Sequence, residues 1–407
     1  MVQFAVRGRG WVLIVLLVAS GGCGGSDAGS EISGPDPASA PPTLDCTAGN
    51  PVCPELVIAG DAHDTSAFRG FADPSLRRDP RTGRLWLAYS WPHVNGSGAV
   101  DIHLAHSDDQ GRSWVYDGAL YSSVLELNPA TLKGGFSSHE VVSLWPDAQA
   151  GGGTNWYGIR LRYHVEPGRG LYGHPTSFQF RIGRADSPLE LARAPEARIG
   201  FGATDPRWNP DLELSSLSPE LARCGLWNEP ALFARGGTLY LFAQCLVFAP
   251  GGRTDDRASF YGIFSTTPAS VDPRGWSWSY RGRLAGHAEA QELDGHNMWV
   301  QLDVAQRADG SLLAVLTPAD YDTNLEWPVH FGCRVLDLTS ADPPALARGS
   351  DSRPVLRASV TASDLVQYGP GACGYEPSSL TGMLFVRKTG NSPSGGVWTL
   401  HRTGLRP

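Results

Sequence analysis

The sequence stretch that decides the fold is SDDQGRSW, Ser107 to Trp114, which lies between two runs of apolar and aromatic residues. Its order predicts a β-hairpin turn. Asp109 can accept hydrogen bonds from backbone N–H groups of the turn, and Gly111 can take a positive φ angle. Trp114 then begins the next strand and is expected to pack inward. These residues are therefore predicted to serve folding and not chemistry.

The composition predicts an all-β fold. The chain of 407 residues is 41% hydrophobic, which is enough for a large core, and its 49 glycines and 31 prolines argue against long helices. The formal net charge is −8 at pH 7, and Lys and Arg are scattered along the chain. This pattern disfavours nucleic acid as a partner.

The first residues predict an export signal. Within residues 1–23, Arg7 and Arg9 precede a short apolar run that leads to Cys23. This order resembles a bacterial lipoprotein signal, in which the cysteine becomes lipidated and anchors the protein to a membrane. Ser20 departs from the aliphatic residue usual at its position, so ordinary signal cleavage and secretion stay open. In either case the protein is expected to be exported.

The cysteine count agrees with export. Residues 24–54 are expected to form a flexible tether with a short disulfide loop near its end. After Cys23, an even number of cysteines remains, which suggests disulfides in an exported protein. Pairing neighbours along the chain predicts Cys46–Cys53, Cys224–Cys245 and Cys333–Cys373, although other connectivities are open. The sequence lacks a short-spaced Cys/His set, so a metal–thiolate site is not expected.

A long repeat predicts the architecture. Five segments each contain an acidic residue, an apolar strand, a turn and a second apolar strand. Their acidic residues are Asp73, Glu140, Glu229, Asp303 and Glu376. Intervals of 67 to 89 residues between these acids suit four-stranded blades with long loops. We therefore predict a β-propeller over residues 55–407, with five blades and with six as the alternative.

The two ends of the propeller are expected to meet. The fifth unit has room for only about three strands before the chain ends at Pro407. The isolated segment Glu55 to Gly60 is predicted to supply the missing outer strand of this last blade, because such closure removes an exposed sheet edge. Residues 353–366 are expected to be a linker into the last blade.

The repeated acids predict a catalytic site. The first strand of each propeller blade lines the central axis, and the five acids stand at the start of these strands. Several carboxyl groups around one funnel would repel one another and raise some pKa values. Cleavage of a glycosidic bond needs one protonated and one ionised carboxyl group. The pattern therefore favours a glycosidase.

Short motifs resemble known families. SDDQGRSW matches the Asp-box found on blade hairpins of sialidases and related β-propellers. ADPS around Asp73 resembles the first-blade aspartate of five-bladed arabinanases, β-xylosidases and invertase-type enzymes, and NEP around Glu229 is similar to their general-acid glutamate. The resemblance implies a carbohydrate substrate, with Asp73 as base or nucleophile and Glu229 as acid. It also implies a third acid that tunes the acid's pKa, which we assign to Glu140, with Asp303 behind it.

A sialidase is an open alternative. Sialidases carry an Arg-Ile-Pro segment on the first blade, whereas this chain has Ala72 and Asp73 there. Arginine pairs suit the capture of a substrate carboxylate, and sialidases use a tyrosine–glutamate pair as nucleophile. The residues that could take these roles are Arg69, Arg160, Arg162, Arg223, Tyr368 or Tyr375, and Glu376.

Further candidates for sugar binding stand beside the strand starts. His139 and His296 could bond sugar hydroxyls, with Asp303, Glu376 and Arg69 as further polar contacts. Trp227 and Trp299 could stack on a pyranose ring or could pack between blades. A second function class is also open, namely a non-catalytic propeller that binds glycan or protein at the cell surface. No cofactor is expected, while a calcium ion on the axis stays open.

Overall fold

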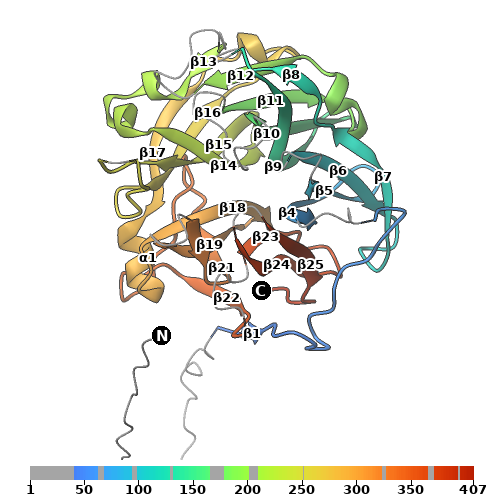
Figure 1. Cartoon of the computed structure of the whole chain (residues 1–407), viewed down its shortest axis with the longest axis vertical. Coiled ribbons are helices and arrows are strands. Elements are labelled where there is room, and N and C mark those ends of the chain that lie inside the picture. Colours follow the sequence, from blue (N-terminus) through green and yellow to red (C-terminus); the bar gives the residue numbers. More distant parts are fainter. Residues whose placement is uncertain are drawn as a thin grey trace, which may run out of the picture. The chain divides into compact units, whose positions relative to one another are not determined.

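The computed structural model describes residues 41–62, 68–93, 99–128, 132–165, 178–200, 210–250, 252–322, 327–364, 371–392 and 395–407. Five small sheets form the five blades of a β-propeller, which confirms the predicted fold (Figure 1). The predicted signal segment, including Cys23, lies outside the described residues. Within the described ranges, no helix is long and apolar enough to cross a membrane.

The first three blades follow one another along the chain, and their strands pair antiparallel in chain order. The first blade contains β4 (Ala72–Arg78), β5 (Leu85–Pro92), β6 (Val100–Ser107) and β7 (Trp114–Tyr121). The second contains β9 (Gly134–Ala148), β10 (Thr154–Val165), β11 (Gln179–Ala185) and β12 (Glu196–Gly200), with β8 (Leu125–Leu127) and β13 (Leu212–Glu213) at its edges. The third contains β14 (Leu226–Arg235), β15 (Thr238–Leu246), β16 (Phe260–Thr266) and β17 (Ser279–Gly286).

The sheets of the last two blades each include a strand from the N-terminal part of the chain. The fourth contains β18 (Met298–Gln306), β19 (Leu312–Asp322), β21 (Cys333–Leu338) and β22 (Leu356–Thr361), with β20 (Trp327–His330) and β1 (Thr43–Asp45) added. The fifth contains β23 (Gly371–Tyr375), β24 (Met383–Ser392), β25 (Gly395–Arg402) and β3 (Phe68–Gly70). The helix α1 (His287–Asp294) lies between the third and fourth blades in the chain, and the short 3₁₀ helices are η2 (Pro188–Arg193), η4 (Leu214–Leu217), η5 (Pro219–Arg223) and η6 (Pro273–Gly275).

The strand that closes the ring differs from the predicted one. The fourth strand of the fifth blade is β3, which pairs in parallel with β25. In the predicted segment Glu55 to Gly60, Glu55 bridges to His401 of β25, but β2 (Ile58–Ala59) pairs with β7 of the first blade. Ile58 is buried in the core between these two blades, and this burial explains its position.

Gly70 allows β3 to turn directly into the first blade. Its φ angle is +123°, and a Cβ atom there would lie 1.9 Å from the carbonyl oxygen of Trp398 in β25. The next residue, Phe71, donates its N–H to the same oxygen at 3.0 Å. Only glycine fits at this junction between the last and first blades.

The N-terminal and C-terminal flanks of the fourth blade also differ from expectation. Residues 353–366, expected to be a linker, include the outer strand β22. The strand β1 lies within the expected tether and pairs in parallel with β22. The sequence-based boundary at residue 55 therefore leaves one strand of this sheet outside the propeller.

The hairpin turn predicted at Ser107 to Trp114 joins β6 to β7. The Asp109 carboxylate accepts a hydrogen bond from the Ser107 hydroxyl at 2.8 Å, and Gly111 has a φ angle of +89°. Trp114 is 1% exposed. The turn also touches the fifth blade, because the Leu380 N–H donates to the Gln110 carbonyl at 2.8 Å.

All three predicted disulfides are present, namely Cys46–Cys53, Cys224–Cys245 and Cys333–Cys373. The second joins the segment before β14 to β15 within the third blade, and the third joins β21 of the fourth blade to β23 of the fifth. Such bridges fit an exported protein.

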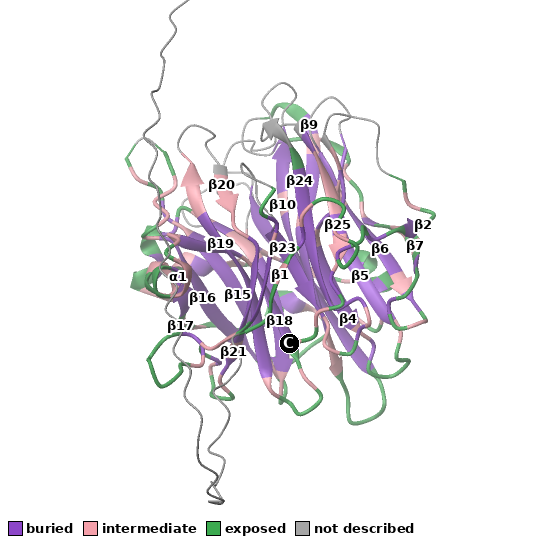
Figure 2. Ribbon diagram, turned by 90° about the horizontal axis from the view of Figure 1, so that it is seen from below, coloured by how far each residue is buried: buried purple, intermediate pink, exposed green. Residues whose placement is uncertain are grey.

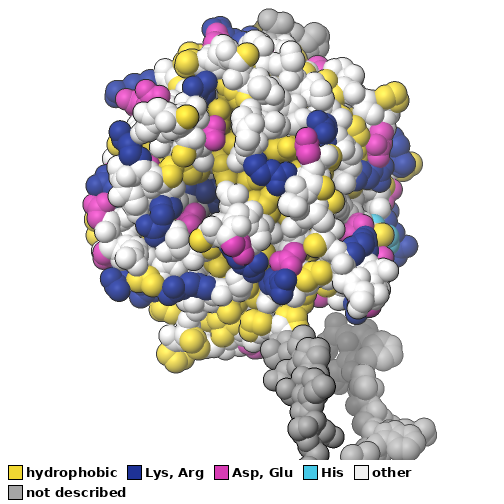
Figure 3. Space-filling model, turned by 180° about the vertical axis from the view of Figure 1, so that it is seen from behind, with side chains coloured by type: hydrophobic (Ala, Val, Ile, Leu, Met, Phe, Trp, Pro, Cys, Tyr) yellow, Lys and Arg dark blue, Asp and Glu magenta, His cyan; other side chains and the backbone are white. Residues whose placement is uncertain are grey.

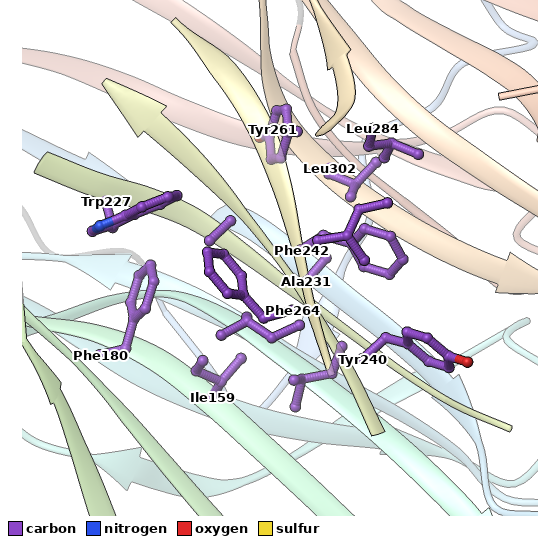
Figure 4. Packing of buried hydrophobic residues seen from close by; sticks show 14 of the residues in the cluster. Ile159, Phe180, Trp227, Ala231, Tyr240, Phe242, Tyr261, Phe264, Leu284 and Leu302 are labelled. Carbon is purple, nitrogen blue, oxygen red and sulfur yellow. The ribbon is translucent and has the colours of Figure 1, made fainter. Parts of the chain in front are cut away.

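The core lies between the blades. The strands are buried along most of their length, whereas the connecting loops carry most of the exposed residues (Figure 2). Between the second and third blades, aromatic side chains such as Phe180, Trp227 and Phe264 fill the space (Figure 4). The surface is mixed: on the face in Figure 3, Lys and Arg are interspersed with Asp and Glu.

Candidate active site

The inner strand of every blade carries a β-bulge at the axis. The pairing register shifts once in each of β4, β9, β14, β18 and β23. At each shift one residue other than glycine takes a left-handed backbone conformation, with φ between 47° and 52°. These residues, called here the bulge ring, are Asp73, Val141, Glu229, Gln301 and Ala372.

The bulge ring builds the candidate site. All five residues line one cavity on the propeller axis. A left-handed conformation is unfavourable for residues with a Cβ atom, and such strain concentrates at functional sites. A bulge also redirects a side chain. Here the bulges bring the polar side chains of Asp73, Glu229 and Gln301 from three different blades to the same cavity.

Asp73 is the member best able to ionise. Its carboxylate accepts a hydrogen bond from Gln301 Nε2 at 3.0 Å, and the Val141 N–H donates to the Ser90 hydroxyl at 3.1 Å. Burial raises the pKa of Asp73 to about 6, although the polar groups of Ser90, Val141 and Gln301 oppose the rise. Asp73 is therefore mostly ionised at neutral pH.

Glu229 favours its protonated form, in contrast to Asp73. Burial raises the pKa of Glu229 well above its usual value, and the charges of Asp73 and Glu140 raise it further. Asn228 Nδ2 donates to Glu229 Oε1 at 3.3 Å. Its Oε2 is buried, with no hydrogen-bond partner in the described part of the chain. Burial and the neighbouring charges therefore favour the protonated form of Glu229.

Glu140 lies one residue before the bulge position of the second blade. Burial, and then the charge of Asp73, raises the pKa of Glu140 to about 8, while the nearby Tyr163 hydroxyl opposes the rise. Glu140 is therefore largely neutral at pH 7. The structure brings the three predicted catalytic residues close enough for their charges to interact.

The repeated acids are not all in register. Asp73 and Glu229 occupy equivalent bulge positions, but Asp303 lies two residues after Gln301 and Glu376 lies four residues after Ala372. Asp303 is 5% exposed and forms an ion pair with Arg77. Glu376 lines a second cavity, at the opposite ends of the inner strands. The prediction of five acids at one mouth is wrong, because the bulges shift the register that the sequence spacing implied.

The predicted histidines are in polar contacts away from the bulge ring. His139 Nδ1 accepts a hydrogen bond from Arg160 Nε at 3.2 Å, and burial and nearby arginines hold the pKa of His139 well below 6.5. His296 contacts the carboxylate of Asp320 at 3.0 Å and stacks on Phe331 with ring centres 4.0 Å apart.

The predicted tryptophans and Arg69 do not face the axial cavity. Trp227 is 0% exposed and packs edge-on against Phe264, and Trp299 is 2% exposed. Neither indole has a free face for a sugar, so the packing alternative holds for both. Arg69 lies on β3, the outermost strand of the fifth blade.

The residues named for a sialidase are dispersed. Arg160 forms a two-contact ion pair with Glu196, and Arg162 pairs with Glu126 at 2.5 Å. The remaining candidates are not gathered with them: Arg223 ends η5, Tyr375 is buried at the end of β23, and Tyr368 lies outside the described residues.

Sequence reasoning missed Gln301. Gln301 follows Glu229 by 72 residues, a spacing within the range of 67 to 89 residues found for the repeated acids. The acidic residue nearest to this position is Asp303, two residues later, and the pattern of acids therefore pointed to Asp303. Across the described ranges, no group of three or more His, Cys, Asp or Glu side chains is arranged to hold a metal ion.

No protein-family model and no curated protein matches the chain. Among solved structures, the chain is similar to Zg3597, a family 117 glycoside hydrolase of the marine bacterium Zobellia galactanivorans, with 12% identity, a TM-score of 0.46 and coverage of 86% of this chain and 88% of that one. It is also similar to an α-L-arabinofuranosidase from Lactobacillus brevis, with 14% identity, a TM-score of 0.39 and coverage of 72% of this chain and 76% of that one. A third similar structure is a protein of unknown function from Dyadobacter fermentans, with 10% identity, a TM-score of 0.43 and coverage of 86% of this chain and 99% of that one.

Proposed function

We propose that the protein is a glycoside hydrolase that cleaves a glycosidic bond at the bulge ring. One observation carries the proposal: carboxyl groups from different blades share one axial cavity. Burial raises the pKa of Asp73 to about 6, and burial together with the charges of Asp73 and Glu140 raises the pKa of Glu229 well above its usual value. The cavity therefore favours the ionised form of Asp73 and the protonated form of Glu229. A base or nucleophile beside a protonated acid is the pair that this reaction requires.

In the proposed reaction, Glu229 donates its proton to the oxygen of the leaving group as the bond to the anomeric carbon breaks. Asp73 either attacks this carbon or removes a proton from the attacking water, depending on the separation of the two carboxyl groups in the complex. Burial and the charge of Asp73 are the larger causes that keep the proton on Glu229. Glu140 contributes negative charge mainly above pH 8, where it ionises.

The substrate is proposed to be a carbohydrate of the arabinan or xylan kind. A sialoside is less well supported, because Arg160 and Arg162 are engaged by glutamates of their own blade. The disulfides fit an exported enzyme, and lipid attachment at Cys23 would hold it at a membrane.

A panel of aryl glycosides that includes arabinofuranosides, xylosides and a sialoside tests the proposal. We expect the purified protein to cleave at least one of them and the variants Asp73→Asn and Glu229→Gln to lose this activity. If the folded wild-type protein cleaves none, the glycosidase proposal fails. A glycan-binding propeller then becomes the better account, and glycan-array binding would test it.

A further inference from the structure

Gln301 connects the fourth blade to the first across the propeller axis. Its Nε2 donates a hydrogen bond to Asp73 Oδ1 at 3.0 Å. An ionised carboxylate can only accept hydrogen bonds, so this contact fixes which end of the amide faces Asp73. The carbonyl end, Oε1, must point elsewhere.

Gln301 Oε1 is buried and has no hydrogen-bond partner among the described residues. An unsatisfied buried polar atom of this kind destabilises a fold, because it loses its hydrogen bonds to water without replacement. The backbone of Gln301 is also strained, with a φ of 52°. Two unfavourable features at one residue of the axial cavity indicate that the side chain has a role beyond folding.

We propose that Gln301 positions Asp73 through Nε2 and that its Oε1 accepts a hydrogen bond from the hydroxyl next to the anomeric carbon of the bound sugar. The inference rests on the proposed function and specifies its substrate class. The two amide atoms belong to one planar group, so a hydroxyl bound at Oε1 lies beside the Asp73 carboxylate. A sugar with a free 2-hydroxyl satisfies this contact, whereas a sialoside has no hydroxyl at the neighbouring ring carbons.

Two variants separate the two contacts. Gln301→Met keeps the size of the side chain and removes both the donor and the acceptor. Gln301→Glu keeps an acceptor oxygen and replaces the neutral amide donor to Asp73 by a carboxyl group, whose negative charge when ionised destabilises the Asp73 carboxylate. Gln306→Met is the matched control, because Gln306 lies on the same strand but is exposed and lines the opposite cavity.

The first experiment needs no substrate. The Asp73 carboxyl is titrated by carbon-13 NMR in the wild type and in each variant, with Asp73→Asn identifying the signal. Loss of the donor destabilises the ionised carboxylate, so we expect the pKa of Asp73 to rise in both Gln301 variants and to stay unchanged in Gln306→Met. An unchanged pKa in a folded Gln301→Met protein overturns the positioning role.

The second experiment compares the best aryl glycoside with its 2-deoxy analogue. We expect the wild type to prefer the parent by about 10- to 100-fold in kcat/KM, Gln301→Met to lose most of this preference and Gln301→Glu to keep much of it. Equal preference in wild type and Gln301→Met overturns the hydroxyl contact. If nothing is cleaved, the proposed function fails, and calorimetric binding of the parent and 2-deoxy methyl glycosides still decides the contact. Absence of any binding counts against it, while the titration decides the positioning role independently.

Discussion

Arg77 of the first blade and Asp303 of the fourth form a buried ion pair at the propeller axis. Arg77 Nη1 donates to Asp303 Oδ2 at 3.1 Å, and the Tyr375 N–H of the fifth blade donates to the same oxygen at 2.9 Å. The Arg77 guanidinium also lies over the ring of Trp145 in the second blade, 5.0 Å from its centre. One ion pair therefore connects four of the five blades next to the bulge ring.

Removing one partner of this pair should destabilise the propeller strongly. Asp303→Ala leaves the Arg77 charge buried and unpaired, so we expect the free energy of unfolding to fall by about 3–5 kcal/mol in urea denaturation. The double variant Arg77→Met/Asp303→Leu should recover much of this loss. Arg84→Ala is the control, because its pair with Asp108 is exposed and should contribute about 0–1 kcal/mol. A loss below 1 kcal/mol for Asp303→Ala would contradict this role.

The axial carboxyl groups should make the protein less stable as the pH rises. The folded-state pKa values of Asp73 and Glu140 are raised to about 6 and about 8, above their usual values of 3.8 and 4.5. Between about pH 4 and pH 8 the folded state therefore holds more protons than the unfolded state, so these groups lower stability with increasing pH. Asp73→Asn should flatten this part of the profile.

The same reasoning predicts that Asp73→Asn raises stability at pH 8 by roughly 1–2 kcal/mol and has little effect at pH 4. Thermal unfolding at both values measures the difference. Asp79→Asn serves as a comparison at a buried aspartate in a turn of the same blade, whose carboxylate accepts local hydrogen bonds. Equal stability changes at pH 4 and pH 8 for Asp73→Asn would count against a buried, proton-binding carboxyl.

Much of the fold could be predicted from the sequence because the repeat has a long and recurring period. The turn at Ser107 to Trp114, the number of blades and the pairing of neighbouring cysteines all depend on local or repeated patterns. The strand that completes the fifth blade, β3, could not be predicted from the sequence. The segment Phe68 to Gly70 is short, whereas Glu55 to Gly60 has the apolar residues of a strand and buries them against the first blade.

The site was readable only in part. Asp73 and Glu229 follow from the repeat, since both precede proline at equivalent points. Gln301 could not be separated from Asp303, because a bulge adds a residue to one strand and its location depends on pairing across the sheet. Trp227 and Trp299 were ambiguous because both faces of a propeller blade are covered, so an aromatic residue near a strand start can equally belong to the core.

The disulfide of the third blade should stabilise the strand that carries Glu229. Cys224 and Cys245 are 21 residues apart, and closing a loop of this size contributes about 3 kcal/mol through the unfolded state. We expect Cys224→Ala/Cys245→Ala to lose roughly this amount in urea denaturation. Dithiothreitol removes three disulfides from the wild type but only two from a variant that lacks Cys46 and Cys53. It should therefore lower the stability of the wild type further than that of this variant. An unchanged midpoint for Cys224→Ala/Cys245→Ala would contradict the prediction.

The pH profile of hydrolysis should separate the roles of the two catalytic carboxyl groups. The acid limb of kcat/KM is expected near pH 6, because Asp73 must be ionised and its pKa is about 6. The basic limb should reflect loss of the proton from Glu229. Glu229→Gln cannot donate a proton, so it should lose at least about 100-fold on poor leaving groups and much less on activated aryl glycosides, and its basic limb should disappear. Glu376→Gln is the matched control, since this glutamate belongs to the same sequence repeat but lines the opposite cavity. If Glu229→Gln kept the wild-type basic limb, or if Glu376→Gln removed it, the acid would have to be assigned to another residue.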